Sequence, residues 1–391
     1  MKTLVLTNDF PPRGGGIETF IHELLRRQAP ESIAVLAASA ASRSDGVTSA
    51  EALAYDTSAG YPIVRLRAGM WPTRAVAQAA VSMAAELGCD RVWLPSSAPH
   101  GLLVPMLQRR GLPVVVATTH GAEAGMAPYP GGRAILRAAA HAQVLTYLGS
   151  WTRSQVQRAL KGTRDDYRWA RLAPGVDVET WRRTDELRDR AHDIRTRLGL
   201  ADRPVVACVS RLVARKGQDR LIAAWPEVLR RFPDAVLLIV GAGPLARKLQ
   251  AQARDLGDSV HFTGRVPYAD LPAYTAVADV CALPARSRLA GFDVEGLGIV
   301  LLEAAALGIP TIASATGGVP DALLPDETGL LLPEAKSEQE HIGHLVDAVV
   351  TLLSDVSLRE RLGTAGAEWV RRQWSWDVPA TTLATLLRSG D

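Results

Sequence analysis

Short apolar runs alternate with longer segments of helical periodicity along almost the whole chain. The runs are continuously apolar or rich in β-branched residues, which is typical of strands covered on both faces of a parallel sheet. We predict strands at Thr3–Leu6, Ser32–Leu36, Arg91–Leu94, Pro113–Ala117, Gln143–Tyr147, Val205–Val209, Ala235–Val240, Val260–Phe262, Val280–Leu283 and Pro310–Ala313. Amphipathic segments such as Leu221–Arg231 and Pro244–Leu256 lie between many of them. This alternation predicts an α/β fold with right-handed crossovers.

The alternation is interrupted once, between residues 177 and 203. The stretch Glu179–Leu200 is dense in charged residues and poor in residues typical of cores. A chain of 391 residues also exceeds the size at which a single core stops growing. We therefore predict two Rossmann-like domains, at 1–176 and 203–373, joined by a linker at 177–202, with their parallel sheets facing each other across a cleft. Residues 374–391 are expected to return to the first domain.

Composition narrows the protein class and the compartment. Hydrophobic residues make up 47% of the chain and charged residues 22%, so the chain is an ordinary globular protein rather than a disordered one. Cys89, Cys208 and Cys281 lie far apart without a Cys/His cluster, which argues against a disulfide framework or a structural zinc site. The N-terminus begins a strand directly, and no run reaches the roughly 18 apolar residues of a membrane span. We expect a cytoplasmic protein.

Charge is unevenly distributed, although the net charge is only +3. Residues 1–174 carry 19 Lys and Arg against 12 Asp and Glu, and the remainder carries 25 against 29. A basic half suits an anionic acceptor or an anionic membrane surface, but a solvated arginine-rich surface explains it as well. Glu18–Arg27 and Arg65–Arg74 mix arginine with apolar residues, which indicates peripheral lipid docking at the inner face of the plasma membrane, unless the first is a core helix with a polar rim. No nucleic-acid partner is expected, and the oligomeric state is not indicated.

Two pairs of residues in the second half could hold a sugar nucleotide. Arg211 and Lys216 lie in a loop directly after a predicted strand, where they can clamp two phosphates unless they are ordinary surface charges. Glu295 precedes, and Glu303 lies within, a helix that we expect to begin near Gly298. A carboxylate inside such an apolar run needs a hydrogen-bonding partner. Sugar and ribose hydroxyls would serve, and an internal salt bridge at Glu303 is the alternative.

Three other motifs have weaker signals. The glycines at 14–16 precede a helix and either approach a phosphate or form a structural turn. Gly241–Pro244 lacks the third glycine of a dinucleotide fingerprint and is better explained as a tight strand-to-helix turn. His120 follows a strand at the side of the expected cleft, where a structural and a catalytic role are both open.

In combination these motifs resemble the retaining glycosyltransferases of family 4, which have the GT-B fold. The Glu-x7-Glu pair, the Arg-x4-Lys pair, the Gly-x-Gly-Pro turn and the glycine loop occur in the family's order, and the resemblance covers essentially the whole chain. Within the family the chain looks most like the actinobacterial phosphatidylinositol mannosyltransferases that add the second mannose, from GDP-mannose to phosphatidylinositol monomannoside. That likeness lies in Ser210–Asp219, Pro284–Val300, Thr118–Glu123 and the terminal Trp-Ser-Trp.

The resemblance implies a role for each matching residue. Arg211 and Lys216 would neutralise the diphosphate, and Glu303 would hold the ribose hydroxyls. His120 would contact a sugar hydroxyl near the reacting carbon. Glu295 would position the transferred sugar and phosphate together with the amides of Gly296, Leu297, Gly298, Ile299 and Val300. The remaining donor contacts would be Gly15 and Gly16 near the phosphates and Arg265 and Val266 at the base.

The resemblance also implies that neither a metal nor another cofactor is needed, and no Asp-x-Asp motif is present. One residue departs from the family's His-Gly-His-Glu pattern, since Ala122 replaces the second histidine. This leaves the acceptor less defined than the donor. The alternatives are a related enzyme with another donor and a soluble acceptor, an epimerase of the same fold, and a dinucleotide-binding dehydrogenase or non-catalytic nucleotide sensor.

Overall fold

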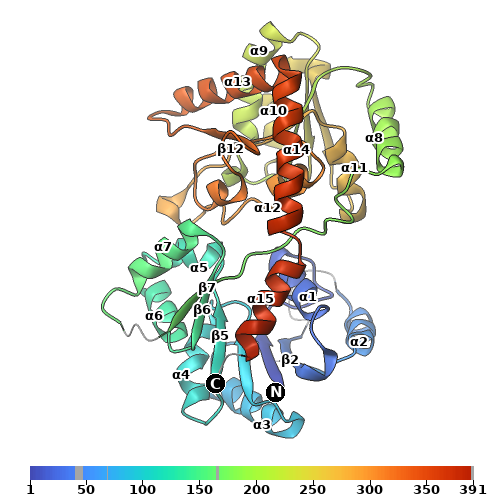
Figure 1. Cartoon of the computed structure of the whole chain (residues 1–391). Helices are drawn as coiled ribbons and strands as arrows, with labels where there is room; N and C mark the ends of the chain where they lie inside the picture. Colours follow the sequence, from blue (N-terminus) through green and yellow to red (C-terminus); the bar gives the residue numbers. More distant parts are fainter. Residues whose placement is uncertain (40–46, 68, 164–166, 389–391) are drawn as a thin grey trace. The chain divides into compact units, whose positions relative to one another are not determined.

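The computed structural model describes residues 1–39, 47–67, 69–163 and 167–388. The chain forms two compact units, one from Met1–Gly175 with Trp376–Asp391 and the other from Val176–Ser375. The last helix therefore belongs to the first unit. Figure 1 shows this helix, α15, beside α1 and β5.

The first unit is built on a seven-stranded parallel sheet in the order β3-β2-β1-β4-β5-β6-β7. Its strands are β1 (Thr3–Thr7), β2 (Ile33–Ala38), β3 (Ile63–Leu66), β4 (Arg91–Leu94), β5 (Val114–Thr118), β6 (Val144–Tyr147) and β7 (Arg168–Arg171). Its helices are α1 (Gly16–Leu25), α2 (Ser49–Ser58), α3 (Arg74–Leu87), α4 (Val104–Gln108), α5 (Gly121–Met126), α6 (Pro130–Ala139), α7 (Ser150–Ala159) and α15 (Asp377–Arg388). The strand order reverses between β1 and β4, and ligands bind at such a switch point in folds of this kind.

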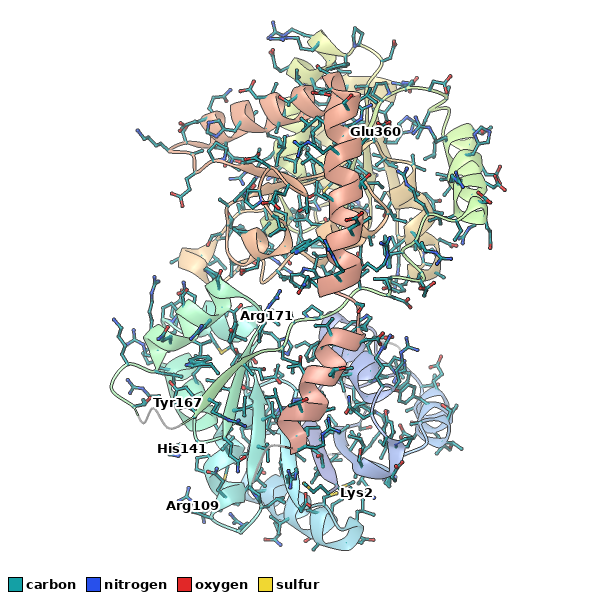
Figure 2. All side chains as sticks on the ribbon, viewed as in Figure 1. Lys2, Arg109, His141, Tyr167, Arg171 and Glu360 are labelled. Carbon is teal, nitrogen blue, oxygen red and sulfur yellow. The ribbon has the colours of Figure 1, made fainter. Side chains whose placement is uncertain are left out.

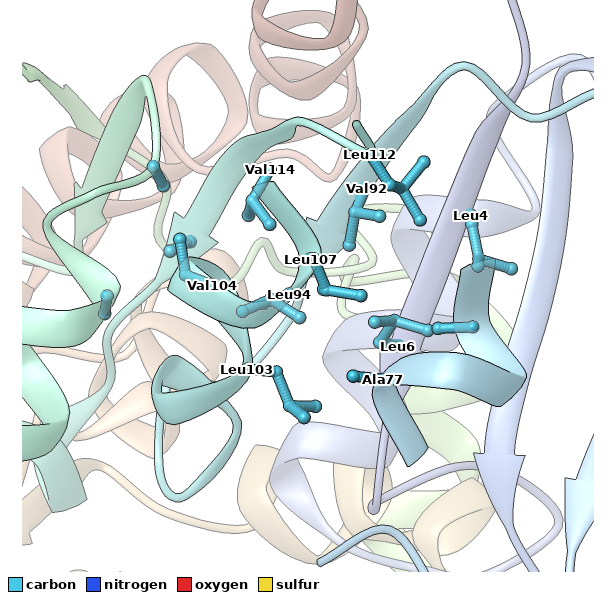
Figure 3. Close-up of a cluster of buried hydrophobic side chains, with 14 of the residues drawn as sticks. Leu4, Leu6, Ala77, Val92, Leu94, Leu103, Val104, Leu107, Leu112 and Val114 are labelled. Atoms are coloured by element: carbon cyan, nitrogen blue, oxygen red, sulfur yellow. The ribbon is translucent and has the colours of Figure 1, made fainter. Parts of the chain in front are cut away.

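Successive residues of β1 enter opposite cores, as expected for a strand covered on both faces. Leu4 and Leu6 pack with α3 and with the segment around Leu103 and Leu107, in the cluster shown in Figure 3. Val5 faces the other cluster, which α1 and α15 contribute to. Both faces of the sheet are therefore covered at β1.

The second unit contains a six-stranded parallel sheet in the order β10-β9-β8-β11-β12-β13. Its strands are β8 (Val205–Val209), β9 (Val236–Val240), β10 (Val260–Gly264), β11 (Val280–Leu283), β12 (Thr311–Ser314) and β13 (Gly329–Leu332). Its helices are α8 (Asp185–Arg197), α9 (Gln218–Arg231), α10 (Ala246–Gln252), α11 (Leu271–Ala276), α12 (Ile299–Ala306), α13 (Glu338–Ser354) and α14 (Val356–Gln373). The order of this sheet reverses between β8 and β11.

All ten predicted strands are present, and their ends differ from the predictions by two residues or fewer. The three missed strands, β3, β7 and β13, lie at sheet edges. Arg171, at the end of β7, and Arg109, after α4, have exposed side chains (Figure 2).

Other expectations changed in detail. Residues 177–202, predicted as a linker, fall within the second unit, where α8 packs on α11. The helix predicted at Pro244–Leu256 is shorter: α10 ends at Gln252, and a 3-10 segment broken by non-helical Gly257 follows.

Cys89, Cys208 and Cys281 are free, and all three are buried. Among the described residues no single helix is long and apolar enough to cross a membrane, and α13 and α14 pass that test only as a pair bent by 98°.

Candidate active site

Two loops meet at the switch point of the second sheet. One follows β8 and carries Arg211 and Lys216, and the other runs from β11 to α12 and carries Glu295. They approach closely at Gly217, which has φ of 78° and where an added Cβ would collide with the carbonyl oxygen of Pro284. Only glycine fits there, because it tolerates the left-handed conformation and has no side chain to block the second loop.

The approach places a cation and a carboxylate from the two loops in contact. Lys216 Nζ lies 2.7 Å from Glu295 Oε2, and both side chains are only 12% exposed. Arg215 Nε lies 3.5 Å from the same oxygen. Burial alone would raise the pKa of Glu295, but the charges of Lys216 and Arg215 outweigh it and hold this pKa below its ordinary value. Glu295 is therefore an anion at neutral pH.

The loop that carries Arg211 is held from two sides. Gln218 Nε2 donates to Ser210 Oγ at 2.8 Å and to the carbonyl oxygen of Arg211 at 3.0 Å. On the other side, Leu212 packs so closely on the Gly241–Pro244 turn that a Cβ at Gly243 would collide with its backbone. These glycines serve close packing, which confirms the tight-turn interpretation. The exposed guanidinium of Arg211 forms no ion pair with any described residue.

Helix α12 begins beside these charges. Its N-cap is Gly298, with φ of 85°, so its first-turn amides lie at the end of the loop that carries Glu295. The donor residues predicted at 296–300 all fall in this loop and first turn.

Glu303 lies within α12 and is 8% exposed. Burial raises its pKa to about 7, although the charge of Lys216 opposes this. Within the described ranges its carboxylate forms no ion pair and no hydrogen bond, so the salt-bridge alternative has no support. A buried carboxyl without a protein partner suits a ligand hydroxyl.

The base residues predicted from the resemblance follow β10, which lies two strands from β8. Arg265 is exposed and Val266 is half-buried. Gly241 N donates to the carbonyl oxygen of Gly264 at 3.1 Å, which ties the ends of β9 and β10 together. Arg211, Lys216, Glu295, Glu303, Arg265 and Val266 thus all belong to the second unit.

His120 lies in the first unit, at the N-cap of α5. Its Nε2 lies 2.7 Å from the carbonyl oxygen of Pro95 and must donate to it, while the ring accepts from the backbone N–H of Glu123. Its ring packs edge-on against Phe20, with the ring centres 5.1 Å apart. Both ring nitrogens are therefore engaged by the protein, and a contact with a sugar stays a prediction.

The Glu18 carboxylate lies against Gly15 in the glycine loop of the first unit. A Cβ on Gly15 would collide with Glu18, whose Oε1 lies 3.2 Å from Arg13 Nη2. Gly16 has open space around it. A Cβ at Gly15 would require only the end of the flexible Glu18 side chain to shift, and the phosphate contact of Gly15 and Gly16 stays a prediction. Ala122 is exposed on α5.

Two neighbours of the site were not singled out from the sequence. Arg215 contacts Glu295 and also Asp293, with Nη1 3.4 Å from Oδ1. Arg215 is next to Lys216, and Asp293 lies two residues before Glu295. This closeness in sequence was the only signal that could have pointed to them. No group of three or more His, Cys, Asp or Glu in the described part of the chain is placed to hold a metal.

The chain is similar to known enzymes over its whole length. A family model described as glycosyl transferases group 1 matches residues 191–369. The GDP-mannose-dependent monoacylated alpha-(1-6)-phosphatidylinositol monomannoside mannosyltransferase of Corynebacterium glutamicum is 40% identical over 391 residues, which cover 99% of this chain and 98% of the relative. The GDP-mannose-dependent alpha-(1-6)-phosphatidylinositol monomannoside mannosyltransferase of Mycobacterium tuberculosis is 39% identical over 394 residues, which cover 100% of this chain and 99% of the relative.

Solved structures have the same fold at lower identity. Anabaena HepE in complex with UDP matches with a TM-score of 0.79 and 20% identity over all of both chains. Sucrose-phosphate synthase from Thermosynechococcus elongatus matches with a TM-score of 0.76 and 21% identity over 99% of this chain and 98% of that one. These likenesses support the GT-B fold alone. The full-length identity goes further, because it makes the chain a member of the group 1 glycosyl transferases, in the family of the GDP-mannose-dependent phosphatidylinositol monomannoside mannosyltransferases.

Proposed function

We propose that this glycosyltransferase moves mannose from GDP-mannose to a phosphatidylinositol mannoside, forming an α-1,6 linkage with retention of the anomeric configuration. The names of the full-length relatives supply the donor and the acceptor. The structural observation that carries the proposal is the contact of Lys216 with Glu295 at the switch point of the second sheet. A cation for phosphate and a carboxylate for hydroxyls are thereby placed in one buried site.

The departing diphosphate is stabilised by fixed positive groups. Arg211 is exposed and without an ion pair among the described residues, and Lys216 is nearly buried against Glu295, which comes three residues before the N-cap of α12. Groups fixed in advance where negative charge develops stabilise the transition state without reorganising. We propose that they take the place of a metal ion.

The transfer exchanges one bond at the anomeric carbon. The bond from this carbon to the β-phosphate oxygen breaks, and its electron pair stays with the phosphate. The acceptor hydroxyl oxygen bonds to the same carbon from the same face, and its proton passes to the departing phosphate. Glu295 accepts a hydrogen bond from a hydroxyl of the sugar, and Glu303 accepts hydrogen bonds from the ribose hydroxyls.

We extend the proposal to a cytoplasmic enzyme with peripheral contact to an anionic membrane. Helix α1 does not supply the contact, because Phe20, Ile21 and Leu24 are buried in the core of the first unit. The segment 65–74 is a better source apart from Ala68, which lies outside the described residues. Trp71 is 71% exposed there, and Arg67 and Arg74 are exposed on either side of it. An exposed indole beside arginines suits the interface of an anionic bilayer.

A transfer assay tests the proposal. Purified protein is incubated with labelled GDP-mannose and phosphatidylinositol monomannoside in vesicles, and the anomer and linkage of the product are determined by NMR. Loss of a single stabilising donor typically costs about 10²–10³ in rate, so Arg211→Ala should lose at least that much. Arg230→Ala is the control, because Arg230 lies exposed on α9 and contacts Glu227.

Other outcomes point to the alternatives. Transfer only to soluble acceptors, or only from another sugar nucleotide, would move the function within the family. Conversion of the donor without an acceptor would indicate an epimerase, and an inverted anomer would overturn the same-face mechanism. Nucleotide binding without turnover of any donor would indicate a sensor.

A further inference from the structure

Arg215 forms ion pairs with two carboxylates, Glu295 and Asp293. Its Nε lies 3.5 Å from Glu295 Oε2, and its Nη1 lies 3.4 Å from Asp293 Oδ1. The Nε atom is buried and has no hydrogen-bond partner among the described residues, so the ion pair with Glu295 is what compensates its burial. The carbonyl oxygen of Arg215 also accepts from Arg286 N at 2.8 Å. Arg215 therefore joins the loop that follows β8 to the β11–α12 loop through both its side chain and its backbone.

Asp293 closes the base of a short loop. Arg288 and Asp293 form an antiparallel bridge, and Arg288 Nη1 lies 3.2 Å from Asp293 Oδ2. Between them Leu289 and Ala290 have φ of 49° and 52°. The left-handed conformation is strained for residues other than glycine, so interactions at the base must hold the loop in this form. The carboxylate of Asp293 is one such interaction, because it takes an arginine on each oxygen.

Both cations around Glu295 contact the same oxygen. Lys216 and Arg215 lie against Oε2, and in the described chain Oε1 forms no ion pair and no hydrogen bond. A carboxylate fixed through one oxygen presents the other in a defined direction. Diphosphate binding would draw Lys216 toward the phosphates, and Arg215 would then be the cation that stays on Glu295.

We propose that Arg215 and Asp293 form a positioning pair that fixes the Glu295 carboxylate for recognition of the donor sugar, independently of the diphosphate clamp. Asp293 orients the guanidinium of Arg215, and Arg215 holds Oε2 of Glu295 while Lys216 serves the diphosphate. The inference rests on the proposed function of the same site. It assigns roles to two residues outside the predicted diphosphate and base contacts.

The test compares binding of GDP with binding of GDP-mannose. Arg215→Gln and Asp293→Asn should change the dissociation constant of GDP by less than about threefold, since GDP lacks the sugar. Both variants should lose most of the extra affinity for GDP-mannose, and kcat should fall roughly 10- to 100-fold because the sugar is held less precisely. The double variant should be no worse than the poorer single variant, because the two residues act as one unit.

Two readouts separate positioning from structural support. Arg215→Lys retains a cation and should restore part of kcat. Arg215→Gln removes one of the two cations that lower the pKa of Glu295, so it should move the acidic limb of the kcat/KM profile to higher pH. Arg230→Gln is the control: it removes an arginine that pairs with Glu227 on α9, outside the site, and it should leave kcat within about twofold. Asp293→Asn keeps the side-chain shape and serves if Arg215→Gln fails to fold.

Results of two kinds would overturn the inference. One is a parallel loss of affinity for GDP and GDP-mannose, which would indicate structural damage to the whole site. The other is kcat within twofold of wild type in both single variants. Failure of the proposed function is distinguishable, because it appears in the wild-type chain as absence of mannose transfer. The same comparison is then made with the sugar nucleotide that the wild type does use and its parent nucleotide.

Discussion

At the scale of single residues, the donor site holds two carboxyl groups in opposite states. Glu295 has two cations against it, and its pKa is held low despite burial. Glu303 is more deeply buried, only the charge of Lys216 opposes that burial, and its pKa is raised to about 7. The difference comes from what surrounds each group, since the residue type is the same. Glu295 is therefore an anion at neutral pH, whereas Glu303 gains its charge near neutral pH.

Glu303→Gln should stabilise the protein at alkaline pH. A raised folded-state pKa means that the native state holds its proton more tightly than the unfolded state, so stability is lost as pH rises from about 4.5 to 7. Above that range the cost is about 3 kcal/mol, and glutamine does not incur it. Urea unfolding at pH 5 and pH 8 should show the variant gaining over wild type only at pH 8. Parallel curves at both pH values would contradict the raised pKa, and Glu334→Gln, at an exposed site, is the control.

Gly217→Ala should damage the donor site more than its backbone strain accounts for. The left-handed conformation costs alanine about 1–2 kcal/mol, and the new Cβ would also push Pro284 away from Lys216. A shift of this size at a catalytic loop can lower the transfer rate roughly hundredfold. Gly111→Ala is matched, since Gly111 has φ of 79° and open space around it. Equal kcat values in the two variants would mean that the approach of the loops is unimportant.

At the scale of elements, the sequence predicted central strands well and edge strands poorly. Central strands such as β5 and β9 are covered on both faces, so they are continuously apolar and easy to detect. At the edges, β3 (IVRL) and β7 (RWAR) carry arginine and are partly exposed, so their patterns are mixed. Their pairing depends on neighbouring strands that are distant in sequence, which a local pattern cannot reveal.

The site was predictable to the extent that its residues follow strands or begin helices. Arg211 and Lys216 stand at the end of β8, and Glu295 and Glu303 flank the start of α12, so topology alone brings them together. The role of Arg215 was not predictable, because it depends on the direction of a side chain across two loops. For the same reason the engagement of both His120 nitrogens by backbone could not be anticipated.

The terminal helix α15 should matter for the stability of the first unit. Leu383 is fully buried in a core that includes Val5 and Phe20, although almost the whole chain separates them in sequence. Leu383→Ala should lower the free energy of unfolding by about 2–5 kcal/mol through lost burial and the remaining cavity. Val378→Ala, at a 40% exposed position of the same helix, should change it by less than about 0.5 kcal/mol. Equal effects in the two variants, measured by urea unfolding, would contradict the packing.

At the scale of the whole molecule, the predicted donor residues are divided unequally between the two units. The residues for diphosphate, ribose and base belong to the second unit, while His120 and the glycine loop belong to the first. If the predicted roles hold, a nucleotide without a sugar should take most of its binding energy from the second unit. Its effect on stability measures the donor site separately from acceptor binding and from the chemical step.

GDP should stabilise the full-length protein against thermal unfolding more than UDP or ADP does. A ligand at a hundred times its dissociation constant adds roughly 2.7 kcal/mol to the state that binds it. At the same concentration Arg211→Ala should show almost none of this gain, since the exposed guanidinium is the part of the clamp that no described protein acid neutralises. Arg230→Ala should retain the full gain. A preference for UDP or ADP would keep the clamp but assign another donor, and no response to any nucleotide would contradict a sugar-nucleotide site in the second unit.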